Sequence, residues 1–230
     1  MPNDDQKQNA PEKTTTLEEL VAERKRKRDR LINEFERDPY GQRTPGIVPI
    51  DEARGLYDAA ADETVKNAEK GQEVEDNRPV VRVAGRVMQH RVMGNLIFAS
   101  IRDHTGDIQL AISKKAVGQP FFSIAKMTDL GDLVTAVGPL GTTKTGEITV
   151  WVSLPPPETD GEESASPYEI TSKSIAPPPG KFHGLTDPEQ RYRKRYVDLY
   201  ANPHVMETMK LRIRIIDEMR RYLIDKGFLE

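Results

Sequence analysis

The sequence predicts a mainly β domain between two helical regions. From Val80 to Leu154 apolar residues alternate with polar ones, which is typical of strands that bury one face. Before and after this segment the apolar spacing changes to three or four residues, which is typical of helices. The chain has 230 residues, of which 31% are charged and 36% hydrophobic. This composition favours a modest folded core with solvated helical extensions.

The composition narrows the classes of function. The net charge of −3 means that a nucleic acid must be bound by local patches rather than by the charge of the whole chain. Cysteine is absent, which excludes disulfides and thiolate metal sites and fits a cytoplasmic protein. No apolar run reaches the ~18 residues of a membrane span. The four histidines lack the spacing of metal ligands, so we expect no metal site.

The N-terminal region predicts a tail followed by helices. Residues 1–16 are polar, and we expect them to be disordered. An apolar stripe with helical spacing then predicts a helix from Leu17 to Arg37. Proline and glycine punctuate residues 40–57, which predicts a loop, and residues 58–75 predict a second, polar helix. We therefore assign residues 17–77 to an N-terminal helical extension.

A run of basic residues lies within the first predicted helix. Runs of charge are usually solvated helix faces, and on sequence alone this interpretation leads. The alternative is a basic arm that makes weak contacts to the phosphates of a nucleic acid. The basic residues are Arg24, Lys25, Arg26, Lys27 and Arg28.

Five segments with alternating apolar residues predict five strands. A short helix candidate, Pro120–Met127, lies between the third and the fourth. The order β-β-β-α-β-β is that of the OB-fold barrel, and few other small β folds share it. We assign this barrel to residues 78–155. The strand candidates are Val80–Gln89, Asn95–Arg102, Asp107–Ser113, Leu133–Val137 and Glu147–Leu154.

The C-terminal region predicts a linker followed by helices. Residues 156–185 are expected to form an acidic, proline-rich insertion and a linker. Asp187 precedes a proline and predicts a capped helix start. Asn202 precedes a proline in the same way, and the helix that follows is expected to span residues 203–226. Its apolar residues fall on roughly one face, so this face needs a covering surface.

Strand alternation places an aromatic ring and two polar side chains on the outside of the barrel. The neighbours of each residue along its strand are apolar and must face inward. The outward residues are Phe98, Gln109 and Glu147. An outward ring beside polar groups favours a platform on which a base stacks while its edge is read. For Phe98 the alternative is that another element of the protein packs over the ring. For Gln109 and Glu147 the alternative is stronger, because isolated surface polar residues usually carry no function.

Three blocks of the sequence resemble the class II lysyl-tRNA synthetases of the class IIb subgroup. They read AGRVMQHRVMGNLIFASIRDHTGDIQL (84–110), DLGDLVTAVGPLGTTKTGEITV (129–150) and GKFHGLTDPEQRYRKRYVDLYANP (180–203). The resemblance spans most of residues 20–230. It implies an anticodon-binding OB domain, followed over residues 186–230 by the first helices of a class II catalytic domain. It also implies an N-terminal part of such an enzyme that ends within motif 1, before the expected "VETP".

The resemblance assigns roles to individual residues. The anticodon-stacking aromatic residue of the family falls on Phe98, and the polar residues that contact bases fall on Arg91, Gln109 and Glu147. Alternation had already placed three of these four outside. Arg91 has the same parity as the inward Val87, so we expect a bulge or a strand end between the two.

The resemblance also implies a reaction and partners. The parent enzyme is expected to be a cytoplasmic homodimer that attaches lysine to tRNA(Lys) and uses ATP and Mg²⁺. In the family the ATP and lysine pockets lie in motifs 2 and 3, which these residues lack. The sequence also contains no phosphate-binding or hydrolase motif. We therefore expect no catalytic residue and no cofactor within this chain, and no lysine activation by it alone.

Two other interpretations remain open at this stage. The chain could be a stand-alone OB-fold module that binds tRNA or another RNA. It could also be a fragment of an aspartyl- or asparaginyl-tRNA synthetase, because these enzymes share the OB domain. The block KFHGLTDPEQRYRKRYVDL at 181–199 argues against this last interpretation.

Overall fold

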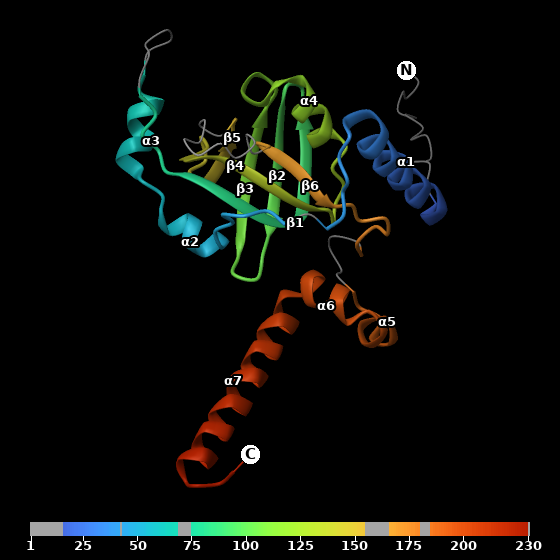
Figure 1. The fold of residues 1–230 in the computed structure, drawn as a ribbon, viewed down its shortest axis with the longest axis vertical. Coiled ribbons are helices and arrows are strands. Elements are labelled where there is room, and N and C mark those ends of the chain that lie inside the picture. The colour runs from blue at the N-terminus through green and yellow to red at the C-terminus, as the bar shows by residue number, and fades with distance from the viewer. Residues whose placement is uncertain (1–15, 42, 69–74, 155–165, 180–184, 230) are drawn as a thin grey trace, which may run out of the picture. The chain divides into compact units, whose positions relative to one another are not determined.

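A ring of five strands forms the centre of the first part of the chain in the computed structural model (Figure 1). The structure describes residues 16–41, 43–68, 75–154, 166–179 and 185–229. By its internal contacts the chain divides into two units, which we call unit 1 (Met1–Pro177) and unit 2 (Pro178–Glu230).

The sheet of unit 1 confirms the predicted OB fold. Its strand order is β1-β2-β3-β5-β4-β6, and β1 also pairs with β4, which closes the first five strands into a ring. β3 and β5 run parallel, and the other paired strands are antiparallel. The strands are β1 (Val80–Met93), β2 (Leu96–Arg102), β3 (Asp107–Ser113), β4 (Leu133–Thr142), β5 (Ile148–Val152) and β6 (Tyr168–Ser172).

Two glycines allow the ring to close and turn. A Cβ on Gly138 would lie 2.1 Å from the carbonyl oxygen of Trp151, so only glycine fits where β4 passes β5. Gly94 has φ +61° in the predicted turn between β1 and β2, a backbone conformation that favours glycine.

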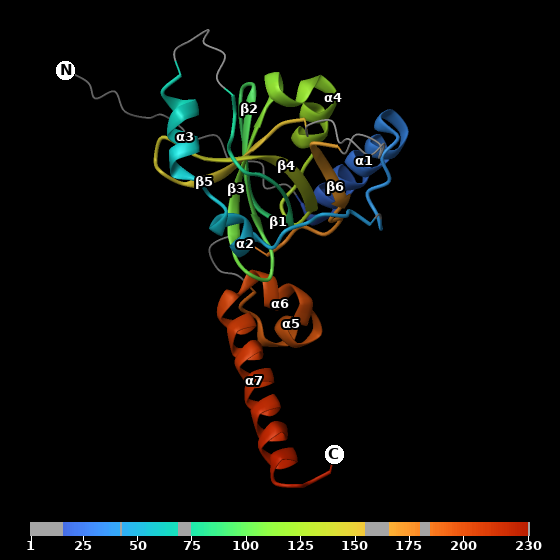
Figure 2. The same cartoon turned by 60° about the vertical axis from the view of Figure 1, so that its left-hand side comes forward.

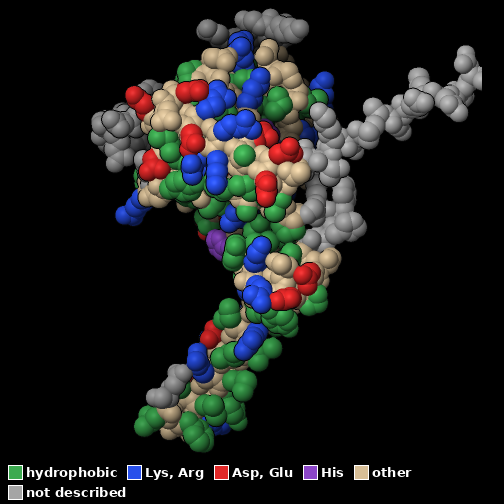
Figure 3. All heavy atoms as spheres, turned by 90° about the vertical axis from the view of Figure 1, so that its right-hand side faces the viewer, with side chains coloured by type: hydrophobic (Ala, Val, Ile, Leu, Met, Phe, Trp, Pro, Cys, Tyr) green, Lys and Arg blue, Asp and Glu red, His purple; other side chains and the backbone are tan. Residues whose placement is uncertain are grey.

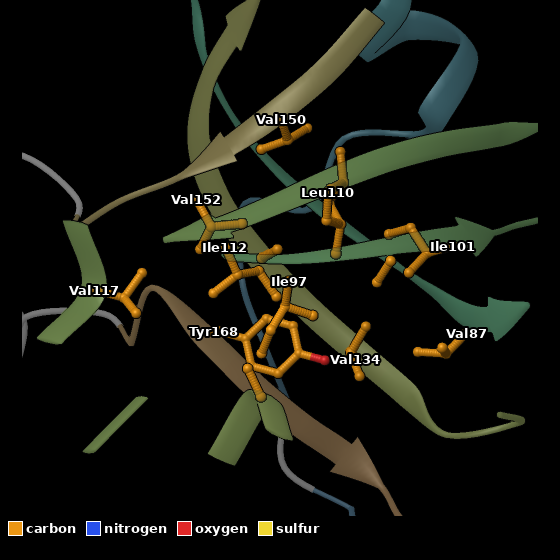
Figure 4. Close-up of a cluster of buried hydrophobic side chains, with 14 of the residues drawn as sticks. Val87, Ile97, Ile101, Leu110, Ile112, Val117, Val134, Val150, Val152 and Tyr168 are labelled. Atoms are coloured by element: carbon orange, nitrogen blue, oxygen red, sulfur yellow. The ribbon is translucent and has the colours of Figure 1, made fainter. Parts of the chain in front are cut away.

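The inward residues of the strands form one core (Figure 4). The alternation predicted for β2 is confirmed, because Ile97, Ala99 and Ile101 are fully buried and the residues between them are not. The helix α4 (Lys114–Lys126) packs against β3 and β6 and adds Phe122 to this core. It begins six residues before the predicted helix and is kinked at Gly118, ahead of Pro120.

The sixth strand was not predicted from the sequence. β6 pairs with β4, and its Tyr168 is completely buried with Oη 2.8 Å from Oγ1 of Thr128. Burial raises the pKa of Tyr168 above its ordinary value. The predicted acidic insertion that precedes β6 lies mostly outside the described residues.

The described residues of the N-terminal extension contain three helices. The first of them, α1, lies near β6 in both views, as does the barrel helix α4 (Figure 2). The first predicted helix is confirmed as α1 (Leu17–Phe35), and Thr16 and Glu19 form a capping box at its start. The predicted loop 40–57 is wrong in part, because it contains α2 (Ile50–Gly55). Burial explains α2, since its Ile50 and Ala53 are fully buried in the barrel core. Of the helix predicted for 58–75, the described residues form α3 (Ala59–Lys66), which Asp58 caps, and residues 69–74 lie outside the described residues.

The regular secondary structure in the described part of unit 2 consists of helices. It contains α5 (Pro188–Arg193), α6 (Arg195–Ala201) and α7 (Pro203–Asp225). Asp187 caps α5 as predicted, with its carboxylate accepting from the N–H of Glu189. The prediction that the side chain of Asn202 caps α7 is wrong. Its amide instead donates to the carbonyl oxygen of Leu185 and to the buried Asp198, which holds the start of α7 against α6.

Candidate nucleic-acid interface

Phe98 lies on the outer face of the barrel, where the sequence placed it. Its two neighbours on β2, Ile97 and Ala99, are fully buried, so the ring of Phe98 points away from the core and is partly exposed. Across the strands its register partners are Arg91 on β1 and Ala111 on β3. Directly paired residues share one face of a sheet, so Arg91 is the cross-strand neighbour of the ring.

The bulge that brings Arg91 to this face is present. Val87 pairs with Ile101, whereas Gln89 pairs with Ser100, so Met88 is the extra residue between them. An extra residue reverses the parity of all later residues on the strand. Arg91 therefore faces outward although Val87 faces inward, as the family resemblance implied. Its Nη2 donates to Oε1 of Gln89 at 3.1 Å, and the side chain is exposed.

Gln109 and Glu147 meet beside this pair. Gln109 on β3 is the register partner of Ser100 on β2, which is two residues from Phe98. Glu147 lies one residue before β5 and is exposed. Nε2 of Gln109 donates to Oε2 of Glu147 at 2.9 Å. Four side chains from β1, β2, β3 and the start of β5 are thus gathered on one outer face of the ring.

This arrangement can do two things chemically. Any of the four bases can stack on the exposed face of an aromatic ring. Hydrogen-bonding groups beside the ring can read the edge of that base, because Arg91 offers donors only and the carboxylate of Glu147 offers acceptors only.

Alternation along β5 offered a signal for one residue that the sequence analysis missed. Thr149 follows Glu147 by two residues and therefore faces outward, on the same side as the inferred platform. It is the register partner of Gln109, and its hydroxyl lies 3.0 Å from Oε1 of that residue. Parallel pairing of β3 with β5 brings the two together.

The basic run on α1 is divided between two faces of the helix. Helical spacing turns Arg24 and Lys27 toward the barrel. Nη1 of Arg24 donates to the carbonyl oxygens of Leu130 and Ser174, and this side chain is buried. Nζ of Lys27 lies 2.6 Å from Oδ1 of Asp129.

The basic side chains on the buried face of α1 thus bind groups of the barrel. Burial by itself lowers the pKa of Lys27, but the carboxylates of Asp129 and Glu23 outweigh it and raise the pKa above its ordinary value. Lys25 and Arg26 are exposed, and Arg28 pairs with Asp29. Basic and acidic side chains lie side by side on the face that carries α1 (Figure 3).

The described residues meet neither the requirements of a metal site nor those of a membrane-spanning helix. Among the residues that the structure describes, no three histidine, aspartate or glutamate side chains are grouped so that they could hold a metal ion. Within the same described ranges, no helix is both long enough and apolar enough to cross a membrane.

Comparisons with known families divide the chain as the two units do. Residues 81–153 match the family of OB-fold nucleic acid binding domains that bind the tRNA anticodon. Residues 187–230 match the family of class II tRNA synthetases for D, K and N. The first match covers the ring of strands that carries Phe98, and the second covers α5, α6 and α7.

Curated relatives extend the similarity over most of the chain. A lysine–tRNA ligase of Halalkalibacterium halodurans is 37% identical over 214 residues, which are 93% of this chain and 38% of the relative. One of Gloeobacter violaceus is 42% identical over 170 residues, 72% of this chain and 31% of the relative. One of an Azoarcus species is 45% identical over 150 residues, 65% of this chain and 27% of the relative. The chain therefore spans well under half the length of each of these relatives.

Proposed function

The chain belongs to the lysine–tRNA ligase family, and from this premise we propose that its OB domain binds the anticodon loop of tRNA(Lys). The observation that carries the proposal is the outward ring of Phe98, with Arg91 directly opposite it and with the hydrogen-bonded pair of Gln109 and Glu147 beside it. The class II match over residues 187–230 favours this function over that of a stand-alone RNA-binding module.

Each of the four side chains has a distinct role in this proposal. Phe98 stacks on one anticodon base. Arg91 donates to the edge of a base, the free carboxylate oxygen of Glu147 accepts from it, and the second N–H of Gln109 donates.

Phe98 variants test the proposal. Loss of one base–aromatic stack typically weakens binding by about 1–3 kcal/mol, so Phe98→Ala should weaken binding to an anticodon stem-loop of tRNA(Lys) to that extent. Phe98→Tyr keeps the aromatic face and should bind nearly as well as the original protein. Phe98→Leu keeps apolar bulk without that face and should behave like Phe98→Ala. Titration of a fluorescently labelled stem-loop measures all three.

The stability of the same variants separates a platform from a core residue. Truncation of a buried phenylalanine to alanine costs roughly 3–5 kcal/mol of unfolding free energy, whereas that of an outward ring should cost little. Trp151 on β5 is the single tryptophan of the chain, so its fluorescence follows the unfolding of the barrel. If Phe98→Ala unfolds the barrel and each folded molecule keeps its affinity, the platform role is wrong.

Gln109 and Glu147 should govern the choice of base rather than overall affinity. A reading site gains selectivity because the wrong base leaves its polar groups unpaired. Gln109→Ala and Glu147→Ala are therefore expected to reduce the ratio of affinities between the lysine anticodon and stem-loops with single-base changes. Equal losses for every stem-loop would contradict this role.

The ligase reaction is proposed for a longer polypeptide that contains these residues. That reaction would attach lysine to tRNA(Lys) with ATP and Mg²⁺, in a cytoplasmic homodimer. Residues 1–230 alone are proposed not to activate lysine, because the sequence contains no phosphate-binding motif. Exchange of pyrophosphate into ATP, in a preparation free of host enzyme, measures this activity, and lysine-dependent exchange above background would overturn the proposal.

A further inference from the structure

A buried hydroxyl lies directly under the Gln109–Glu147 pair. Thr149 is completely buried, although it faces the outer side of the barrel. Its Oγ1 lies 3.0 Å from Oε1 of Gln109 and 3.0 Å from the carbonyl oxygen of Glu147. Because the side chains above it exclude solvent, Thr149 cannot itself touch a bound base.

The hydrogen bonds around Gln109 allow only one orientation of its side-chain amide. The carboxylate of Glu147 can only accept, so the amide of Gln109 must turn its NH₂ group toward Oε2 of Glu147. Oε1 of Gln109 then faces Thr149 and needs a donor. In the opposite amide orientation, the carbonyl oxygen of Gln109 would face the carboxylate, and two acceptors would be in contact.

Thr149 has one proton and two acceptors within reach. The carbonyl oxygen of Glu147 already accepts from the N–H of Thr143 at 3.1 Å. In the described part of the chain, Oε1 of Gln109 has no hydrogen-bond donor other than Thr149. The hydroxyl of Thr149 therefore leaves no acceptor unpaired when it donates to Oε1 of Gln109. This gives a chain of hydrogen bonds from Thr149 through Gln109 to Glu147.

From this geometry we propose that Thr149 is a positioning residue that, together with Glu147, holds the side-chain amide of Gln109 in place and thereby governs the choice of base. The proposal rests on the anticodon function proposed above and deepens it. With the amide held, the outer surface presents a donor of Gln109 beside an acceptor of Glu147. Without the hydroxyl, Oε1 of Gln109 loses its donor and only the hydrogen bond to Glu147 holds the amide, so Gln109 becomes mobile and the site accepts a wrong base more readily. Stacking on Phe98 is unaffected.

Three variants with matched chemistry test this role. Thr149→Val removes the hydroxyl and keeps the shape, and Thr149→Ser keeps the hydroxyl. Thr171→Val on β6 is the control, because Thr171 also bonds a carbonyl oxygen, that of Leu133, but lies away from the pair. The readout is the ratio of affinities for the lysine anticodon stem-loop and for a copy with one anticodon base changed.

The expected pattern is specific. A hydrogen bond of ordinary net strength predicts that Thr149→Val lowers the affinity ratio about three- to tenfold. Thr149→Ser and Thr171→Val should keep the original ratio. In a Gln109→Ala background, Thr149→Val should have no further effect, because it acts through Gln109. An unchanged ratio in Thr149→Val, or full additivity with Gln109→Ala, overturns the proposal.

A measurement without RNA separates this inference from the anticodon function. Side-chain amide NMR of the free protein should show Gln109 ordered in the original protein and in Thr149→Ser, and mobile in Thr149→Val. If Gln109 stays equally ordered in Thr149→Val, Thr149 does not position it, whatever the RNA data show. If instead the amide loosens while Phe98→Ala leaves RNA binding intact, the anticodon function fails and the role of Thr149 in base choice fails with it.

Discussion

In unit 1 the apolar side chains of the strands, α2 and α4 meet in one core, whereas in unit 2 those of α7 remain exposed. Both regions have apolar residues at regular spacing, so both form regular secondary structure. In the described part of unit 2, however, Val205 is the single apolar side chain that is buried. The exposed apolar residues of α7 are Leu211, Ile213, Ile215, Ile216, Met219, Tyr222, Leu223 and Ile224, with exposures from 37% to 62%.

The difference shows that periodicity and burial are separate properties. A period of 3.6 predicts that a helix has an apolar face, but it does not say which surface covers that face. The strands of unit 1 carry their covering partners within the same sequence segment, because the ring closes on itself. Among the described residues of unit 2, the main contact of α7 is with α6.

Hydrogen exchange should give the largest contrast between the units. A single helix such as α7 is only marginally stable in water without tertiary packing. In dilute monomer we expect amides from Met209 to Leu223 to exchange by local fraying at little free-energy cost, while those of β2 and β3 require opening of the whole barrel. Global opening of a domain costs about 5–15 kcal/mol.

Concentration separates fraying from association. If α7 becomes protected only as the protein concentration rises, its apolar face is covered by a second copy, and the homodimer proposed above gains support. Protection of α7 equal to that of the barrel strands in dilute monomer would break the contrast between the two units.

A buried ion pair should have the next largest effect, confined to unit 1. Nζ of Lys173 lies 2.6 Å from Oδ2 of Asp129 and 2.7 Å from Oδ2 of Asp132, and the side chains of Lys173 and Asp132 are fully buried. Removal of one partner leaves a buried charge without compensation, which costs about 3–5 kcal/mol. Lys173→Met should therefore lower the unfolding free energy of the barrel by that amount, measured by urea unfolding with Trp151 fluorescence.

The same substitution at an exposed lysine is the control. Lys115 on α4 is exposed, so Lys115→Met should change stability little. Equal losses for the two variants would show that the ion pair adds nothing beyond surface charge.

The smallest expected effect concerns the outer face of α1. Lys25 is exposed, unlike its neighbour Arg24, so Lys25→Ala should leave stability almost unchanged. If Lys25 contacts RNA phosphates, the variant should weaken all tRNAs alike and lower the slope of log affinity against log salt by about one. Lys115→Ala removes the same charge elsewhere on unit 1, and an equal change in slope for both variants would argue against a phosphate contact at α1.

The outward directions of the side chains at the proposed platform were largely accessible from the sequence. Alternation on β2 and β3 assigned Phe98 and Gln109 to the outer face, because a strand side chain has only two directions. For Arg91 it was the family resemblance that implied an outward side chain, and its parity with the inward Val87 then required the bulge that the structure contains. These inferences succeeded because they depend on residues close together in the chain.

Other features depend on partners far away in the chain, and periodicity could not reveal them. α2 and β6 are five or six residues long, so their patterns are too short to stand out, and burial against the barrel stabilises them. Arg24 belongs to a run that resembles a solvated face. Its acceptors lie on Leu130 and Ser174, which are 106 and 150 residues away.

Local spacing thus accounts for the element types, for the inward and outward directions of their side chains and for the family resemblance. The pairing of distant strands accounts for the rest. The parallel alignment of β3 with β5 brings Thr149 under Gln109, and the linker after β6 supplies carbonyl oxygens to α1. The physical reason is that a side chain's direction follows from its own backbone, whereas its partner follows from how the whole chain closes its core.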